Sequence, residues 1–173
     1  MRYIRKLSKK SNLFKIKDST VNDDIDADVL RQELSTSGNK LSFWKCENSE
    51  DLKDAMKAIL LSSTGIETSQ FIIIEDLVLE KYGIEMDDSE KGATGYKGFE
   101  DWHVNFCKLN YGKLGVLLDI IKEIASDENN TPELKREEVK KYIIEVREAG
   151  LLNEERLKPE LKSAIERYCP VSA

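Results

Sequence analysis

Residues 70–76 read QFIIIED, and this stretch decides which kind of fold the sequence predicts. Phe71 and three isoleucines follow one another, so the segment is apolar on both faces of an extended chain. β-Branched residues favour strands, and a strand that is apolar on both faces must be covered on both. We therefore expect residues 70–76 to form a central strand of a sheet that helices cover.

Strand-like and helix-like patterns alternate around this stretch. Residues 40–46 alternate like a strand, and residues 47–63 carry a capping signal followed by an apolar stripe at helical spacing. Residues 101–109 again predict a strand, and residues 110–126 a helix. This order predicts an α/β or α+β fold with a small three- to five-stranded sheet covered by helices.

The C-terminal part predicts a helical hairpin. Thr131 is a suitable N-cap, Pro132 suits the first position of a helix, and Gly150 is a typical residue at its end. We expect residues 1–127 to form the core domain with a basic N-terminal leader, and residues 128–173 to form a helical hairpin appendage.

Composition limits the class of protein. Of the 173 residues, 40% are hydrophobic and 35% are charged, and no apolar run approaches the roughly 20 residues that span a bilayer. The three cysteines, Cys46, Cys107 and Cys169, contain no closely spaced pair, which disfavours a disulfide framework or a zinc ribbon. These features predict a cytoplasmic protein with no membrane partner, no cofactor and no metal.

The charges are segregated along the first 34 residues. Residues 1–17 hold seven basic and no acidic residues, whereas residues 18–34 hold six acidic residues and one arginine. The leader could contact nucleic acid, could form an edge strand protected by its cations, or could pair with the acids that follow it. The residues expected at a nucleic-acid contact are Arg2, Arg5, Lys6, Lys9 and Lys10.

His103 is the only histidine and follows two acids, Glu100 and Asp101. One catalytic hypothesis makes it a general base beside one of these carboxylates. On a strand, however, its side chain is too far from that of Cys107 for a direct Cys–His pair, and two ligands do not make a zinc site. We expect a structural role for His103, so that its substitution changes stability.

Two further segments do not match the ligand-binding motifs that they resemble in part. The glycines of residues 86–98 recur every third residue and precede a strand, whereas nucleotide-binding loops precede a helix. The alternating acids of residues 22–28 lack the glycine and glutamate of a calcium loop. We therefore expect residues 86–98 to form a surface loop and residues 22–28 to begin a helix.

The hairpin carries the residues most expected to bind a partner. Tyr142, Ile143 and Val146 belong to one apolar stripe, and Leu151 and Leu152 place apolar side chains at a turn. With acids and bases nearly balanced over this region, it does not resemble the cationic recognition helix of a DNA reader.

The leading hypothesis is therefore a protein-interaction module, an accessory subunit or an immunity- or antitoxin-like partner of a larger protein. The alternative is a nucleic-acid-associated processing factor, or a small enzyme that uses His103 with a nearby carboxylate.

Overall fold

The computed structural model describes residues 1–7, 33–125 and 127–169, and every structural statement here concerns these residues. They fold as an α+β protein. The strands are β1 (Arg2–Lys6), β2 (Leu41–Cys46), β3 (Ser69–Glu75), β4 (Glu85–Asp87), β5 (His103–Cys107) and β6 (Glu133–Leu134). The helices are α2 (Ser49–Leu60), α3 (Asp76–Lys81), α4 (Tyr111–Ala125), α5 (Arg136–Glu148) and α6 (Pro159–Tyr168).

The six strands form one antiparallel sheet in the order β4-β5-β2-β1-β3-β6. The fold class is confirmed at the level of α+β, but the expected number of three to five strands is wrong. The extra strands are short edge strands: β4 has three residues and β6 has two. Segments this short hold too few positions to show an alternating pattern.

Strand β1 lies inside the sheet, between β2 and β3. The interpretation of the leader as a protected edge strand is therefore wrong for residues 2–6. Tyr3 and Ile4 are buried on opposite faces of the sheet. Because long basic side chains can bury their stems and carry their charge to the surface, cations do not restrict a strand to the edge.

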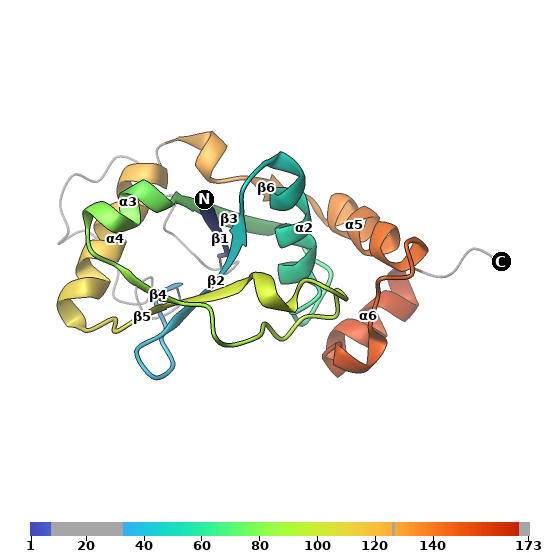
Figure 1. Ribbon diagram of the computed structural model, residues 1–173. Coiled ribbons are helices and arrows are strands. Elements are labelled where there is room, and N and C mark those ends of the chain that lie inside the picture. The colour runs from blue at the N-terminus through green and yellow to red at the C-terminus, as the bar shows by residue number, and fades with distance from the viewer. Residues whose placement is uncertain (8–32, 126, 170–173) are drawn as a thin grey trace.

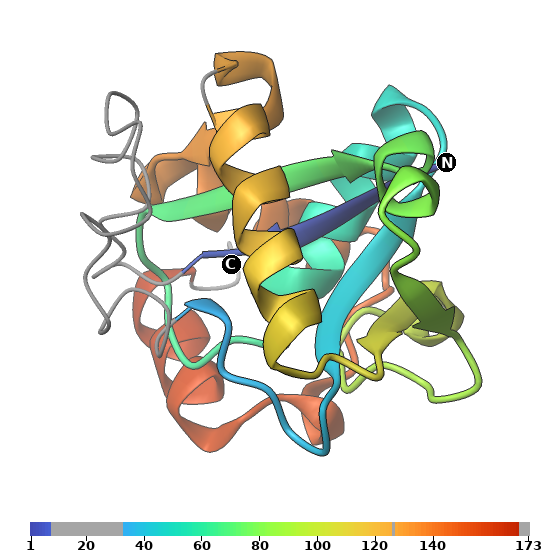
Figure 2. The same ribbon diagram turned by 90° about the vertical axis from the view of Figure 1, so that its left-hand side faces the viewer.

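Helices cover both faces of the sheet (Figure 1). Helix α4 crosses one face, as Figure 2 shows, and α2 packs on the other, where α5 and α6 lie farther out. On β3, Phe71 and Ile73 belong to the buried cluster of α2, whereas Ile72 and Ile74 belong to that of α4. The prediction of a strand that is apolar on both faces is confirmed.

The hairpin helices belong to the same buried cluster as α2. Five of their side chains are buried there: Val139, Ile143, Val146, Leu161 and Ile165. Helix α5 begins at Arg136, four residues after the expected start at Pro132, because Glu133 and Leu134 pair with β3 as the edge strand β6. Gly150 ends the helix region in the left-handed conformation, at φ 70°, as expected.

Residues 86–98 are largely irregular, as the sequence predicts, but β4 extends into their start. No helix of the described residues is long and apolar enough to cross a membrane.

Candidate functional site

His103 lies beneath the irregular segment that follows β4. Its Nδ1 is 3.0 Å from the carbonyl oxygen of Glu90, and its ring meets the indole of Trp44 edge-on at 5.7 Å. Gly92 approaches so closely that a Cβ there would lie 2.5 Å from the Trp44 ring and 2.9 Å from the Cβ of His103. The imidazole therefore connects a strand to the segment above it.

The two acids before His103 are directed to other partners. Glu100 accepts a hydrogen bond from the Gly98 amide at 2.9 Å and forms an ion pair with Arg156 at 3.0 Å. Asp101 pairs with Lys91 at 3.0 Å. Among the described residues neither carboxylate hydrogen-bonds to His103, so the structure does not assemble the expected general-base pair.

The polar row beside His103 is held by Glu90. Its carboxylate accepts hydrogen bonds from Lys40 at 2.7 Å and from Asn105 at 3.0 Å. The amide oxygen of Asn105 accepts one from the Ser42 hydroxyl at 3.3 Å. These bonds satisfy polar groups on a face that the loop covers, which buried polar groups require.

Among the described residues of the leader, the basic side chains have separate contacts. Arg5 donates to the carbonyl oxygens of Ser42 at 2.9 Å and Glu33 at 3.4 Å, and burial lowers its pKa. Lys6 pairs with Glu67 at 3.4 Å. Lys9 and Lys10 lie outside the described residues, and Arg2 lies at the opposite end of β1 from Lys6.

The predicted partner-binding residues of the hairpin divide into two groups. Ile143 and Val146 are 1% exposed and face α2, so this conformation gives a partner no access to them. Tyr142 is half-buried, with the ammonium groups of two α2 lysines 5.2 and 5.8 Å from its ring. Leu151 is 36% exposed, and Leu152 pairs with Tyr96 in an isolated bridge.

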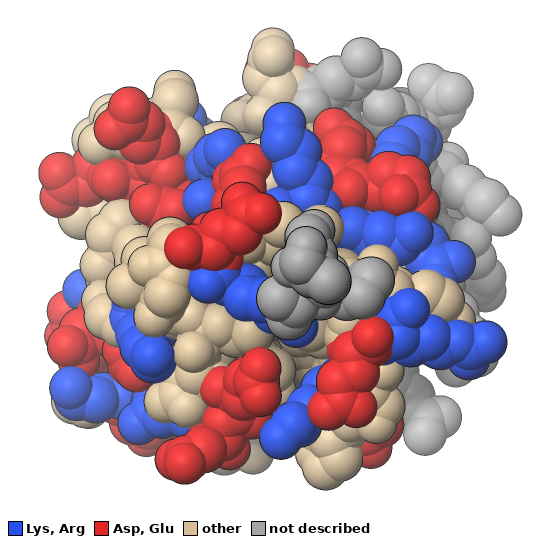
Figure 3. Space-filling model, turned by 90° about the vertical axis from the view of Figure 1, so that its right-hand side faces the viewer, with Lys and Arg blue, Asp and Glu red and all other residues tan. Residues whose placement is uncertain are grey.

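The outer face of the hairpin mixes both signs of charge. Figure 3 views the molecule from the side of α5 and α6, and acidic and basic side chains are interspersed over the face that it draws in colour. Such a face gives little selection of a partner by charge.

Two of the three thiols, those of Cys46 and Cys169, are buried. Cys46 is buried, and burial raises its pKa to about 11, which keeps it protonated near neutral pH. Burial also raises the pKa of Cys169. Within the described ranges no three His, Cys, Asp or Glu side chains gather as a metal site would require.

The sheet ends in two adjoining hollows that sequence reasoning missed. The register places the start of β1 opposite the ends of its neighbours, because Arg2 is opposite Cys46 on β2 and Glu75 on β3. The first hollow, about 470 Å³, is lined by Met1, Lys45, Cys46, Glu47, Asp51, Asp101 and Trp102. The second, about 380 Å³, is lined by Met1, Arg2, Glu47, Glu75, Asp76 and Leu77. We call them the Trp102 hollow and the Leu77 hollow.

Apolar side chains are exposed at these hollows. Leu77 is 73% exposed and Met1 is 47% exposed. Trp102 is half-buried and packs against Phe99 with 4.7 Å between ring centroids, and Phe99 stacks on Tyr96. The contact with Phe99 thus restricts the indole, as expected for a preorganised contact residue.

The charged groups at the hollows differ in their partners. Lys45 pairs with Asp88 at 3.0 Å. One oxygen of Asp51 accepts hydrogen bonds from the Glu47 and Asn48 amides, at 3.1 and 3.3 Å, as part of the cap of α2. For the carboxylates of Glu47 and Glu75 the structure records no partner among the described residues.

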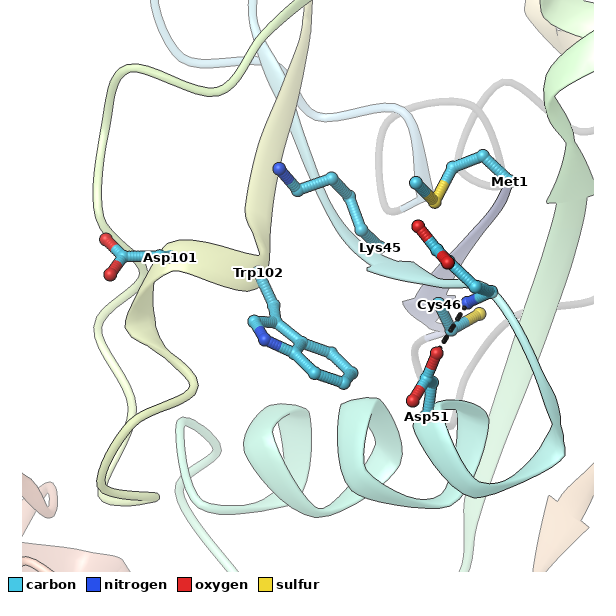
Figure 4. A pocket seen from close by; sticks show the side chains of 7 residues that line it. Met1, Lys45, Cys46, Asp51, Asp101 and Trp102 are labelled. Atoms are coloured by element: carbon cyan, nitrogen blue, oxygen red, sulfur yellow. Dashed lines mark hydrogen bonds between the residues drawn. The ribbon is translucent and has the colours of Figure 1, made fainter.

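Figure 4 shows how the Trp102 hollow is formed. The Trp102 ring and the Asp51 carboxylate lie on the same side of α2, while Lys45 extends away from both. Asp101 lies on the far side of the backbone that carries Trp102, and its carboxylate turns away from the hollow. The interior is therefore bounded by an aromatic side chain and by carboxylates.

No sequence motif signals these hollows, because their residues come from separate segments that only the strand register brings together. The clearest local signal is Leu77, an apolar residue near the start of a short helix.

By fold, the described residues are an α+β domain with a six-stranded antiparallel sheet and helices on both faces. Comparisons with protein-family models, with curated proteins and with solved structures find no match to this chain.

Proposed function

We propose that this chain is a cytoplasmic protein-interaction module, an accessory subunit or an immunity- or antitoxin-like partner of a larger protein. The observation that carries the proposal is the pair of hollows at the end of the sheet. There an exposed leucine, an exposed methionine and a half-buried tryptophan lie near the carboxylates of Glu47 and Glu75, for which the described residues record no partner. Aromatic residues and methionine are enriched at the centres of protein interfaces, and polar groups surround them.

The net charge of the chain also supports the proposal, because electrostatic attraction acts over long distances. The chain carries a net charge of −6, and acids outnumber bases in the lining of both hollows. Such a charge favours the approach of a basic partner and speeds its association. The partner side of the interface is therefore expected to be basic.

The alternative of an enzyme or nucleic-acid factor has less support. His103 contacts a main-chain carbonyl, and its neighbouring acids have other partners. Arg5 and Lys6 also have intramolecular partners.

The test is affinity capture of the tagged full chain from its native host, comparing the wild type with Leu77→Asp. We expect one stoichiometric partner with the wild type and at least about a tenfold loss with the variant, as for an interface hot spot. The matched control is Tyr111→Asp, because Tyr111 is 96% exposed and lines neither hollow.

Two results would overturn the proposal: the absence of any stoichiometric partner of the wild type, or equal loss with both variants. Melting temperatures of the three proteins show that each is folded.

A further inference from the structure

We propose that the Trp102 hollow receives an arginine side chain of the partner, with its guanidinium between the Trp102 indole and the carboxylates of Glu47 and Asp51. This inference rests on the proposed function for the origin of the arginine and adds the chemistry by which the partner is recognised.

The carboxylate of Glu47 can accept a cationic ligand. Glu47 is exposed at the rim of both hollows, and its side chain has no recorded partner in the described part of the chain. Lys45 does not neutralise the site, because its ammonium group pairs with Asp88. The Glu47 carboxylate is therefore available to a cationic group.

The carboxylate of Asp51 uses only one of its two oxygens in the cap of α2. Its recorded hydrogen bonds all end on Oδ2, from the Glu47 amide, the Asn48 amide and the Asn48 side chain. Among the described residues no hydrogen bond is recorded to Oδ1, and Asp51 lines the hollow (Figure 4). A guanidinium has five N–H donors and can contact carboxylates of two residues at once, which an ammonium group does less well.

The indole of Trp102 offers a surface on which a guanidinium can stack. A guanidinium stacks on the face of an indole, and tryptophan is the best partner for such cation–π contacts. Phe99 packs against the indole and restricts its motion, so less ordering entropy is lost when a ligand stacks on it. The hollow, at about 470 Å³, is within the size of small-ligand sites, roughly 300–1,000 Å³.

The hollow can be tested without the partner. N-acetyl-arginine methylamide is titrated into the full-length protein while the two indole N–H signals are followed by NMR. Trp102→Phe assigns the Trp102 signal, and Trp44, which is 6% exposed and does not line the hollow, is the internal reference. We expect a saturable shift of the Trp102 signal at millimolar ligand and none at Trp44.

Two matched controls isolate the charge. The citrulline analogue has nearly the same shape without the charge, and it should leave the Trp102 signal unchanged. Glu47→Gln should weaken arginine binding about threefold or more, whereas Glu50→Gln should change it much less, because Glu50 is in the first turn of α2 but does not line the hollow.

Each outcome bears on one of the two proposals. No saturable shift, an equal response to citrulline, or equal effects of the two substitutions would overturn the arginine site. If arginine fails while capture still depends on Leu77, the interaction module stands with another recognition chemistry. If arginine binds and no partner is captured, the site stands and the proposed function fails.

Discussion

The ionisation of Asp87 depends on its local contacts. Its carboxylate accepts hydrogen bonds from the Ser89 hydroxyl at 2.6 Å and the Ser89 amide at 3.0 Å, and it pairs with Lys40 at 3.2 Å. These contacts, those of Ser89 first, lower its pKa from 3.8 to about 2. They connect the end of β4 to the segment that covers His103.

The predicted pH dependence follows from this lowered pKa. A group with a lower pKa in the folded state stabilises the fold above its unfolded pKa, and that contribution is lost as the pH falls through the folded pKa. For Asp87 the loss should occur between about pH 4 and pH 2. An NMR titration of its carboxyl carbon should give a midpoint near 2, and Ser89→Ala should raise that midpoint. A wild-type midpoint near 3.8 would contradict the contacts.

Single residues also show what the sequence could and could not predict about the site. The structural role expected for His103 agrees with its contacts to Glu90 and Trp44. The position of Trp102 beside Asp51 could not be predicted, because it depends on how the 3-10 turn η3 (Glu100–Trp102) lies against α2. A pattern within one segment carries no information about such a contact.

At the scale of elements, the contact between α2 and α5 includes a group of ion pairs. Lys57 on α2 is only 11% exposed in its side chain and pairs with Glu145 on α5 at 3.2 Å and with Asp54 at 3.2 Å. Lys53 reaches the same Glu145 oxygen at 3.0 Å. Glu145 therefore joins the two helices through two lysines.

Glu145→Ala should lower the free energy of unfolding by about 1–2 kcal/mol, because it leaves the half-buried Lys57 with one carboxylate partner. Glu137→Ala is the matched control: Glu137 also pairs with a lysine on α5, but it is 79% exposed, so the loss should be about 0.5 kcal/mol or less. Urea unfolding of both variants measures the difference. Equal losses would show that the α2–α5 ion pairs do not hold the hairpin.

The division of the chain at residue 127 stays a prediction, and the packing of the hairpin sharpens its test. A chain that ends at Ala125 loses β6 and the five buried side chains of α5 and α6. We expect this truncated chain to lose its cooperative thermal transition, because buried residues of α2 such as Met56 and Ile59 would be exposed. A transition at the wild-type temperature would establish the hairpin as an appendage.

Elements with strong local signals were predicted well. The capping signal at the start of α2, which Asn48 supplies, and the doubly apolar pattern of β3 appear in the structure as the sequence indicates. The short strands β4 and β6 were missed because two or three residues pair through main-chain bonds that side-chain patterns do not reveal. The late start of α5 has the same cause, since β6 occupies the residues before it.

At the scale of the whole molecule, the order of the strands creates the candidate site. Because β1 is inserted between β2 and β3, its first residue meets the ends of both neighbours, and Met1 lines both hollows. Sequence patterns give the strands but not their order, which depends on long-range pairing. This is why the fold class could be predicted and the hollows could not.

The central claim is that a partner binds at these hollows, and hydrogen–deuterium exchange of the full-length chain, alone and with its captured partner, tests it most directly. The account predicts that partner-induced protection is concentrated in the segments 45–51, 75–77 and 100–102, which contain most of the residues that line the hollows. Residues 149–152, at the turn of the hairpin, are the internal comparison. Protection confined to that turn, with no change at the three segments, would contradict the account.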